Sequence, residues 1–160
     1  MKRFCLFLFL SVLSFNSITL WGQQLIVQAN SGKQVVLTRS DIDVLPHVKV
    51  NVNNLPEPAT FEGVSLKSVL EKAGIEFGET LKGKQLATCL VVEAADNYRV
   101  VIALPELDPA FTNKQILLIF LRDGKPLVEK EGPYRIVIPD EKKMARWVRQ
   151  VTRLKIVDVP

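Results

Sequence analysis

The chain has 160 residues, of which 48% are hydrophobic and 24% are charged, and its formal net charge at pH 7 is +4. This composition is that of an ordinary folded domain and excludes a disordered or collagen-like chain. No basic helix and no basic stripe with interleaved aromatic residues occurs, so nucleic acid is not an expected partner.

The first 22 residues differ in character from the rest. A basic start at Lys2 precedes an apolar run, which polar residues interrupt from Ser14 onward and which the small residue Gly22 ends. An uninterrupted membrane span needs about 20 apolar residues. The pattern therefore predicts a cleaved signal peptide over 1–22, a single domain over 23–160, export to the periplasm or the medium, and no membrane span after cleavage. An uncleaved membrane anchor is the alternative.

Cysteine content limits the chemistry of the expected domain. Cys89 is the only cysteine outside the predicted signal peptide. An internal disulfide and a cysteine-rich zinc or iron–sulfur site are therefore excluded. The domain is long enough to form one hydrophobic core without disulfides.

The first half of the domain alternates between strand and helix patterns. Apolar, β-rich runs at 25–29 and 34–37 predict a hairpin. Ser40 is the expected N-cap of a short helix, which Pro46 ends. Alternating valines then predict a half-buried strand over 48–52.

A second helical pattern begins at Ser65, and Gly74 supplies the left-handed position that ends it. Most of the later chain is predicted as strand, over 87–93, 98–104, 116–121, 134–138 and 147–157. About eight strands with a few short helices in mixed order argue for an α+β domain with a largely antiparallel or mixed sheet.

Several short motifs resemble one known family in their order and spacing. They are Leu45-Pro46, Phe61-Glu62-Gly63-Val64, Ala95-Asp96-Asn97-Tyr98, Asp123-Gly124-Lys125-Pro126, Gly132-Pro133-Tyr134-Arg135 and Arg146-Trp147-Val148. Together they are similar to the oxidoreductase molybdopterin-binding domain of sulfite-oxidase-like enzymes, especially its small exported members, over nearly all of 25–157. The resemblance implies the sulfite-oxidase-type fold, a mixed, mostly antiparallel sheet or distorted barrel with short helices.

The resemblance also implies molybdopterin as a cofactor, with a cysteine thiolate on the molybdenum. In the family that cysteine lies between the strand matching 48–52 and the motif at Phe61. Residues 51–60 of this chain contain no cysteine. The amides of Asn51 and Asn53 are poor replacements for a soft, anionic sulfur. The sequence therefore predicts no metal ligands and argues against molybdenum ligation.

Other residues with reactive side chains have simpler explanations. Cys89 lies in a predicted strand between apolar neighbours and is expected to be a small buried side chain, not a ligand or nucleophile. His47 is the only histidine, and no base–orienter pair is evident from spacing, so a surface role is expected. Asp96 and Asp123 are expected to be turn residues.

A basic cluster near the C-terminal end is the most suggestive polar feature. It consists of six lysines and arginines within residues 142–155, namely Lys142, Lys143, Arg146, Arg149, Arg153 and Lys155. The resemblance implies that basic side chains hold the phosphate of the pterin, and arginine forks suit that geometry. The predicted cofactor-binding residues are Asn51, Asn53, Arg135, Lys143 and Arg146. The alternative is a solvated strand face with a lysine-protected edge.

Two leading functions remain open at this stage, beside a third possibility, a structural or chaperone-like domain whose cofactor pocket has closed. One is an exported sulfite-oxidase-fold domain that binds a small anionic, pterin-like ligand or a protein partner without its own molybdenum–thiolate centre. The other is a working molybdopterin-dependent oxidoreductase of the cell envelope, acting on a small oxyanion or sulfoxide with an envelope redox partner. The fold alone does not choose between them.

Overall fold

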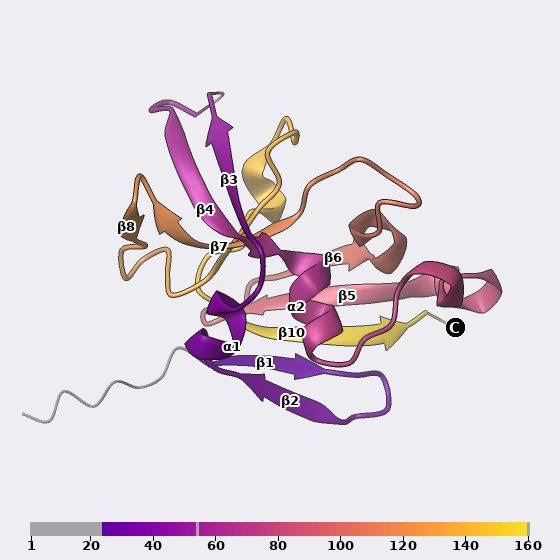
Figure 1. The fold of residues 1–160 in the computed structure, drawn as a ribbon. Coiled ribbons are helices and arrows are strands. Elements are labelled where there is room, and N and C mark those ends of the chain that lie inside the picture. Colours follow the sequence, from indigo (N-terminus) through magenta and orange to yellow (C-terminus); the bar gives the residue numbers. More distant parts are fainter. Residues whose placement is uncertain (1–23, 54, 160) are drawn as a thin grey trace, which may run out of the picture.

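The strands form two sheets, which the computed structural model describes for residues 24–53 and 55–159 (Figure 1). The order in sheet A is β2 (Gln34–Leu37), β1 (Leu25–Gln28), β10 (Val151–Asp158), β5 (Thr88–Ala94) and β6 (Arg99–Ala103). The order in sheet B is β3 (His47–Val52), β4 (Ala59–Ser65), β7 (Leu117–Arg122) and β8 (Lys125–Pro126), and β9 (Arg135–Val137) also pairs with β7.

Strands β1 and β10 are parallel, and the other pairings between the described strands are antiparallel. The predicted α+β class with mostly antiparallel sheets is therefore confirmed. Within the described residues both sheets stay open, so the expected barrel is not closed. In Figure 1, β3 and β4 extend away from sheet A as a long hairpin.

The helices of the described chain are short. They are α1 (Arg39–Asp43), α2 (Leu66–Lys72) and the 3-10 turns η1 (Gly78–Thr80), η2 (Gly83–Ala87), η3 (Leu104–Leu107) and η4 (Met144–Arg146). Helix α2 buries Leu66, Val69 and Leu70. It ends as predicted, with Gly74 at a φ of 88°.

The N-terminal hairpin is confirmed, but the predicted cap of α1 is wrong. Thr38 caps the helix, because its hydroxyl accepts a hydrogen bond from the Asp41 amide at 3.3 Å. The Asp41 carboxylate in turn accepts a hydrogen bond from the Thr38 amide at 2.9 Å. This reciprocal capping box needs a hydroxyl three residues before the acidic residue, whereas Ser40 directly precedes Asp41.

Two predicted turns are confirmed by their backbone conformations. Asn97, at a φ of 68°, lies in the turn between β5 and β6, where the Asp96 carboxylate accepts a hydrogen bond from the Tyr98 amide at 2.9 Å. Asp123 and Gly124, at φ values of 51° and 73°, join β7 to β8. These residue types tolerate the left-handed region or bond their own backbone.

The last strand differs from its prediction at its start. Residues 147–150 are not strand, and β10 begins at Val151. The Trp147 indole N–H instead donates to the carbonyl of Ile138 at 3.1 Å, in the segment after η4. Strand β10 is paired on both sides, with β1 and β5. The alternative of a lysine-protected edge is therefore wrong for the β10 residues Arg153 and Lys155.

Inward-facing residues of both sheets form one core. Leu90 and Val92 of β5 and Leu154 of β10 contribute from sheet A, while Phe61 of β4 and Leu118 of β7 contribute from sheet B. Along β5 the buried residues alternate with half-buried ones, because successive side chains of a strand point to opposite faces of the sheet. This shared core therefore holds the two sheets together.

The predicted signal peptide, residues 1–22, lies outside the described residues. Among the residues that the structure does describe, no helix is long and apolar enough to cross a membrane.

Candidate functional site

A cavity of about 340 Å³ opens beside the β3–β4 connection. Its apolar wall is formed by Leu55, Pro56, Phe61 and Met144. Its charged wall is formed by Glu57, Arg122, Glu131, Arg135 and Arg149. The cavity therefore adjoins the interval in which the resemblance placed a metal-binding cysteine, and it combines a small apolar surface with three arginines.

Arg135 is the most buried charged residue of this cavity, with 5% of its surface exposed. Its Nη1 donates to Glu131 Oε1 at 2.7 Å. Its Nε is buried and has no hydrogen-bond partner among the described residues. Leaving a buried donor unpaired costs about 1–3 kcal/mol, so such an atom marks a place where a ligand or an ordered water would complete the structure.

Aromatic rings surround the Arg135 guanidinium. Its central carbon lies 5.8 Å from the ring centre of Phe61 and 5.6 Å from that of Trp147. Burial lowers the pKa of Arg135, and the neighbouring charge of Arg149 lowers it further, whereas the charge of Glu131 opposes both effects. Arginine stays protonated despite such shifts, so the cavity keeps a fixed buried cation.

A second guanidinium approaches the same carboxylate. Arg122 Nη1 lies 3.8 Å from Glu131 Oε1, and the Arg122 guanidinium also lies 5.8 Å from the centre of the Phe61 ring. With Arg149, three cations share the cavity with the two carboxylates Glu57 and Glu131. The excess of positive charge, set against an apolar wall, favours a small anion with an apolar part.

The sheet brings these arginines together from distant parts of the sequence. Arg122 ends β7 and Arg135 begins β9, and these strands pair antiparallel. The Ile136 amide donates to the Val148 carbonyl at 2.8 Å, and the Val151 amide donates to the Tyr134 carbonyl at 2.9 Å. These two bonds hold the segment that carries Arg149 against β9.

Of the five predicted cofactor-binding residues, Arg135 lines this cavity and the other four do not. Asn51 and Asn53 are exposed near the end of β3, and the Asn51 side-chain oxygen accepts a hydrogen bond from Thr60 Oγ1 at 2.8 Å. Lys143 is exposed just before η4.

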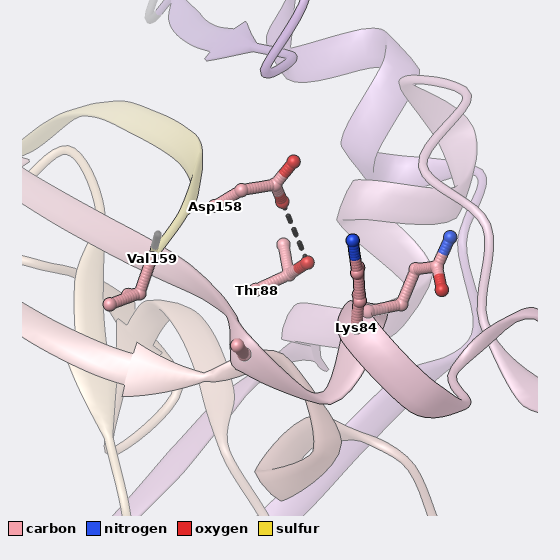
Figure 2. Close-up of a pocket in the computed structure, with 6 residues that line it drawn as sticks. Lys84, Thr88, Asp158 and Val159 are labelled. Atoms are coloured by element: carbon pink, nitrogen blue, oxygen red, sulfur yellow. Dashed lines mark hydrogen bonds between the residues drawn. The ribbon is translucent and has the colours of Figure 1, made fainter.

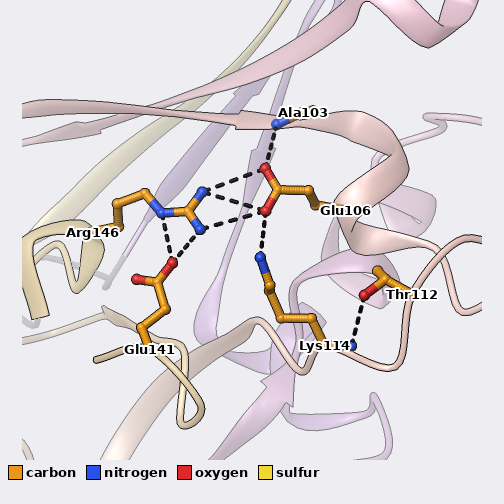
Figure 3. A network of polar contacts seen from close by, with 6 residues as sticks. All are labelled: Ala103, Glu106, Thr112, Lys114, Glu141 and Arg146. Carbon is orange, nitrogen blue, oxygen red and sulfur yellow. Dashed lines mark hydrogen bonds and ion pairs between the residues drawn. The ribbon is translucent and has the colours of Figure 1, made fainter. Parts of the chain in front are cut away.

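Arg146 belongs to a separate polar network (Figure 3). Its Nε donates to Glu141 Oε1 at 2.8 Å, and its Nη2 contacts the same oxygen. Its Nη1 also reaches both oxygens of Glu106, at 3.4 and 3.5 Å, and Lys114 Nζ donates to Glu106 at 2.8 Å. These contacts engage Arg146 within the fold, where it fixes η4 next to the cavity.

The carboxylates of the network affect ionisation. The hydrogen bond to Glu141 raises the pKa of Arg146. Burial raises the pKa of Glu106, but the hydrogen bonds from Lys114 and Arg146 outweigh burial, so the net pKa lies below the ordinary value. Both shifts favour the charged forms, so Glu106 and Arg146 are charged at neutral pH.

Sequence reasoning missed Arg122 and Glu131, and it included Arg149 only as one member of the basic cluster. A usable signal existed in each case. Arg122 precedes the Asp123-Gly124 turn, and Glu131 precedes the motif that begins at Gly132. Charged residues at the ends of strands and beside turns are placed on loops, where binding sites concentrate.

A larger hollow, of about 460 Å³, lies near the end of sheet A and is lined by Lys84, Thr88 and Asp158 among others (Figure 2). Thr88 Oγ1 donates to one Asp158 oxygen at 2.7 Å, and Asn30 Nδ2 donates to the other at 2.5 Å. Both carboxylate oxygens are therefore engaged inside the fold. Because charged groups do not converge there as they do around Arg135, we favour the smaller cavity as the site.

The remaining candidates lie away from the cavity lining. Cys89 is on β5 of sheet A, paired with Ala103 and Val157. Its side chain was expected to be buried, but it is only half-buried. It is half-buried because every second residue of β5 faces away from the core.

His47 is exposed, as expected, and lies on β3. Its Nδ1 is 3.1 Å from Glu62 Oε1, a cross-strand partner that spacing did not reveal. Within 24–53 and 55–159 no group of three or more histidine, cysteine, aspartate or glutamate side chains is arranged to hold a metal ion.

Comparison with known proteins identifies the family of this chain. The model of the oxidoreductase molybdopterin-binding domain matches residues 46–160. The chain belongs to this family. Among solved structures, the sulfane dehydrogenase SoxCD from Paracoccus pantotrophus is similar, with a TM-score of 0.65 and 20% sequence identity. The match covers 85% of this chain and 38% of the SoxCD chain, so it shows the fold alone. No curated protein sequence matches.

The predicted sulfite-oxidase-type fold is thus confirmed, and the cofactor of the molybdopterin-binding family can be tested against the cavity. The unpaired Nε of Arg135 and the cations Arg122 and Arg149 fit a phosphate or another oxyanion. Among the residues that the structure describes, no thiolate for molybdenum is supplied there, since Cys89 lies in the other sheet. The residues fit the anionic part of molybdopterin but not the family's metal–thiolate bond.

Proposed function

We propose that this member of the molybdopterin-binding family is an exported domain that binds a small, pterin-like anion without a molybdenum–thiolate centre of its own. The observation that carries the proposal is Arg135, a buried guanidinium whose Nε has no partner among the described residues and which lines the cavity beside the β3–β4 connection. The basic start and apolar run of residues 1–22 support export.

The lining of the cavity supports the ligand class. Arg122, Arg135 and Arg149 would hold a phosphate or similar group, because guanidinium groups bind such oxyanions through paired hydrogen bonds. Leu55 and Met144 offer an apolar surface to the rest of the ligand. Polar groups that converge beside an apolar surface are usual in a small-molecule site.

Inorganic phosphate is the probe for the anion-binding part of the proposal. Calorimetric titration should show binding to the chain that weakens at least about tenfold in Arg135→Gln, which corresponds to the loss of about one charge-assisted contact. Arg99→Gln is the control, because it removes the same charge from an exposed residue of β6. Equal phosphate affinity in both variants would contradict the proposal.

Metal and pterin analysis tests the other part. The protein is purified from the envelope of a molybdenum-replete host, beside a Cys89→Ala variant. We expect substoichiometric molybdenum in both preparations, with no effect of the substitution. About one molybdenum and one pterin per chain would overturn the proposal, and loss of metal in the variant would assign Cys89 as the ligand.

The second candidate is a working molybdopterin-dependent oxidoreductase of the cell envelope, which the family match over residues 46–160 favours. Under this hypothesis a small oxyanion or sulfoxide is the substrate and an envelope protein exchanges the electrons. Turnover of sulfite or a sulfoxide by cofactor-reconstituted protein, with an artificial electron carrier, would support it. Reconstituted protein without turnover would count against it.

A further inference from the structure

Glu131 occupies the place of an anion in the cavity. Its Oε1 accepts a hydrogen bond from Arg135 at 2.7 Å and lies 3.8 Å from Arg122 Nη1. Its side chain is only 14% exposed. A carboxylate in this position makes the same kind of contact that an anionic ligand would make with these guanidiniums.

The backbone of Glu131 is held in place on both sides. Its amide donates to the Val128 carbonyl at 2.8 Å, and its carbonyl accepts from the Gln150 amide at 3.0 Å. The Gln150 side chain also donates to the Glu129 carbonyl at 2.9 Å. Because the backbone is fixed, movement of Glu131 away from the arginines would be a side-chain rotation, which is fast and local.

Glu131 satisfies the arginines only in part. Both guanidiniums approach the same oxygen, Oε1, and the Nε of Arg135 stays without a partner among the described residues. An oxyanion with three or four oxygens can reach more of these donors than one tethered carboxylate can. A ligand entering the cavity must nevertheless share the arginines with Glu131 or displace it, since like charges repel strongly at this range.

We infer that Glu131 is an internal counter-anion that competes with the ligand for Arg122 and Arg135. This inference rests on the proposed function and adds a regulatory element to the same site. The tethered carboxylate keeps the arginines paired when no ligand is bound, and it raises the ligand concentration needed for occupancy. Weakly bound anions are thereby excluded in favour of multidentate oxyanions of the phosphate type.

The test compares phosphate binding to the wild type, Glu131→Gln and Glu129→Gln by calorimetric titration. Glutamine keeps the size of the side chain and removes its charge, and Glu129 is an exposed residue two positions away. We expect Glu131→Gln to bind phosphate about tenfold more tightly than the wild type, a coupling of ordinary size. Glu129→Gln should stay within about twofold, because an exposed charge is screened.

The outcomes separate this inference from the proposed function. If the wild type binds phosphate and both glutamine variants bind it with the same affinity as the wild type, competition by Glu131 is overturned and the anion site stands. If none of the three binds, both are overturned. Binding by Glu131→Gln alone would support the inference.

Glu131→Asp covers the case in which the glutamine variant does not fold. It keeps the charge in the cavity but withdraws the carboxylate from Arg135, so a smaller gain in phosphate affinity is expected. Affinity equal to or below that of the wild type in a folded Glu131→Asp protein would overturn the inference.

Discussion

A Cβ atom added to Gly63 would lie 2.1 Å from the carbonyl oxygen of Leu118. It would also lie 2.7 Å from the Cα of Ile119, the residue that pairs with Gly63 across β4 and β7. Both are backbone atoms, which cannot rotate away as a side chain can. The close approach occurs where the β4–β7 register is irregular, between Glu62 and Gly63.

Gly63→Ala should therefore force β4 and β7 apart. We expect a loss of about 3 kcal/mol in the free energy of unfolding, at the upper end of the usual cost of overpacking. Urea unfolding followed by circular dichroism measures it. Gly32→Ala is the control, because Gly32 has a φ of 85° and no atom within 4 Å of its added Cβ. It should lose about 1 kcal/mol from backbone strain alone, and an equal loss in both variants would rule out the steric explanation.

Tyr134 should ionise far later than an ordinary tyrosine. Its side chain is fully buried, and burial raises the pKa of its hydroxyl to about 12. An absorbance titration of Tyr98→Phe, which leaves Tyr134 as the only tyrosine, should show the midpoint of phenolate formation at about pH 12. A transition near pH 10 in folded protein would contradict this burial.

The same shift makes stability depend on pH in the alkaline range. The folded state holds the Tyr134 proton more tightly than the unfolded state, whose tyrosine pKa is about 10. Stability from this group is therefore complete below about pH 10 and falls as pH rises toward 12. Tyr134→Phe should therefore lose less stability than the wild type as the pH rises. Denaturant unfolding of both proteins at each pH measures the difference.

Glu106 should make the protein sensitive to acid. Its pKa lies below the ordinary value, because the hydrogen bonds from Lys114 and Arg146 outweigh burial. Its stabilisation is therefore present above the unfolded pKa of about 4.3 and is lost as pH falls below that value. Glu106→Gln should be about 1 kcal/mol less stable than the wild type at pH 6, since solvent screens part of the interaction.

The difference in stability between the wild type and Glu106→Gln should then shrink toward zero as the pH is lowered through the folded-state pKa of Glu106. Denaturant unfolding at a series of pH values measures it. Glu76→Gln, at an exposed carboxylate, is the control and should show a small difference at every pH. A gap between the wild type and Glu106→Gln that stays constant with pH would argue against the ion network in Figure 3.

Local patterns in the sequence predicted most of the elements, because their signals act over a few residues. The left-handed stop of α2 at Gly74 and the turn at Asn97 are examples. The start of β10 could not be predicted in this way, since Trp147 and Val148 are as apolar as strand residues. Gln150, at a φ of 48°, lies directly before the strand, and the sequence does not reveal that conformation.

The arginine cavity was predicted only in part for a related reason. Arg135 was found through a motif, but its neighbour Arg122 reaches it through the pairing of β7 with β9, a long-range contact. Arg146 looked equivalent to Arg135 in sequence. What distinguishes the two is that Glu106 and Glu141 engage Arg146, whereas Arg135 keeps an unpaired donor. Such differences depend on which carboxylates the fold brings close.

The last prediction concerns the buried pair Arg135 and Glu131. Arg135→Met would remove the cation and leave Glu131, which is 14% exposed, with the longer ion pair to Arg122 as its remaining one within the described chain. Removing one partner of a buried pair leaves an uncompensated charge, so we expect a loss of about 3 kcal/mol. Arg99→Met is the control at an exposed pair with Glu93 and should cost less than about 1 kcal/mol.

The double variant Arg135→Met with Glu131→Met should recover most of that loss. Methionine fills a similar volume without a charge, and replacing a buried ion pair by apolar side chains is often neutral for stability. Urea unfolding of the wild type, both single variants and the double variant gives the coupling free energy. If the double variant is as unstable as Arg135→Met alone, the loss comes from packing around Phe61 and Trp147 and not from the unpaired charge. If it recovers, the arginine is retained at this position for a reason other than stability, which is what a ligand-binding residue requires.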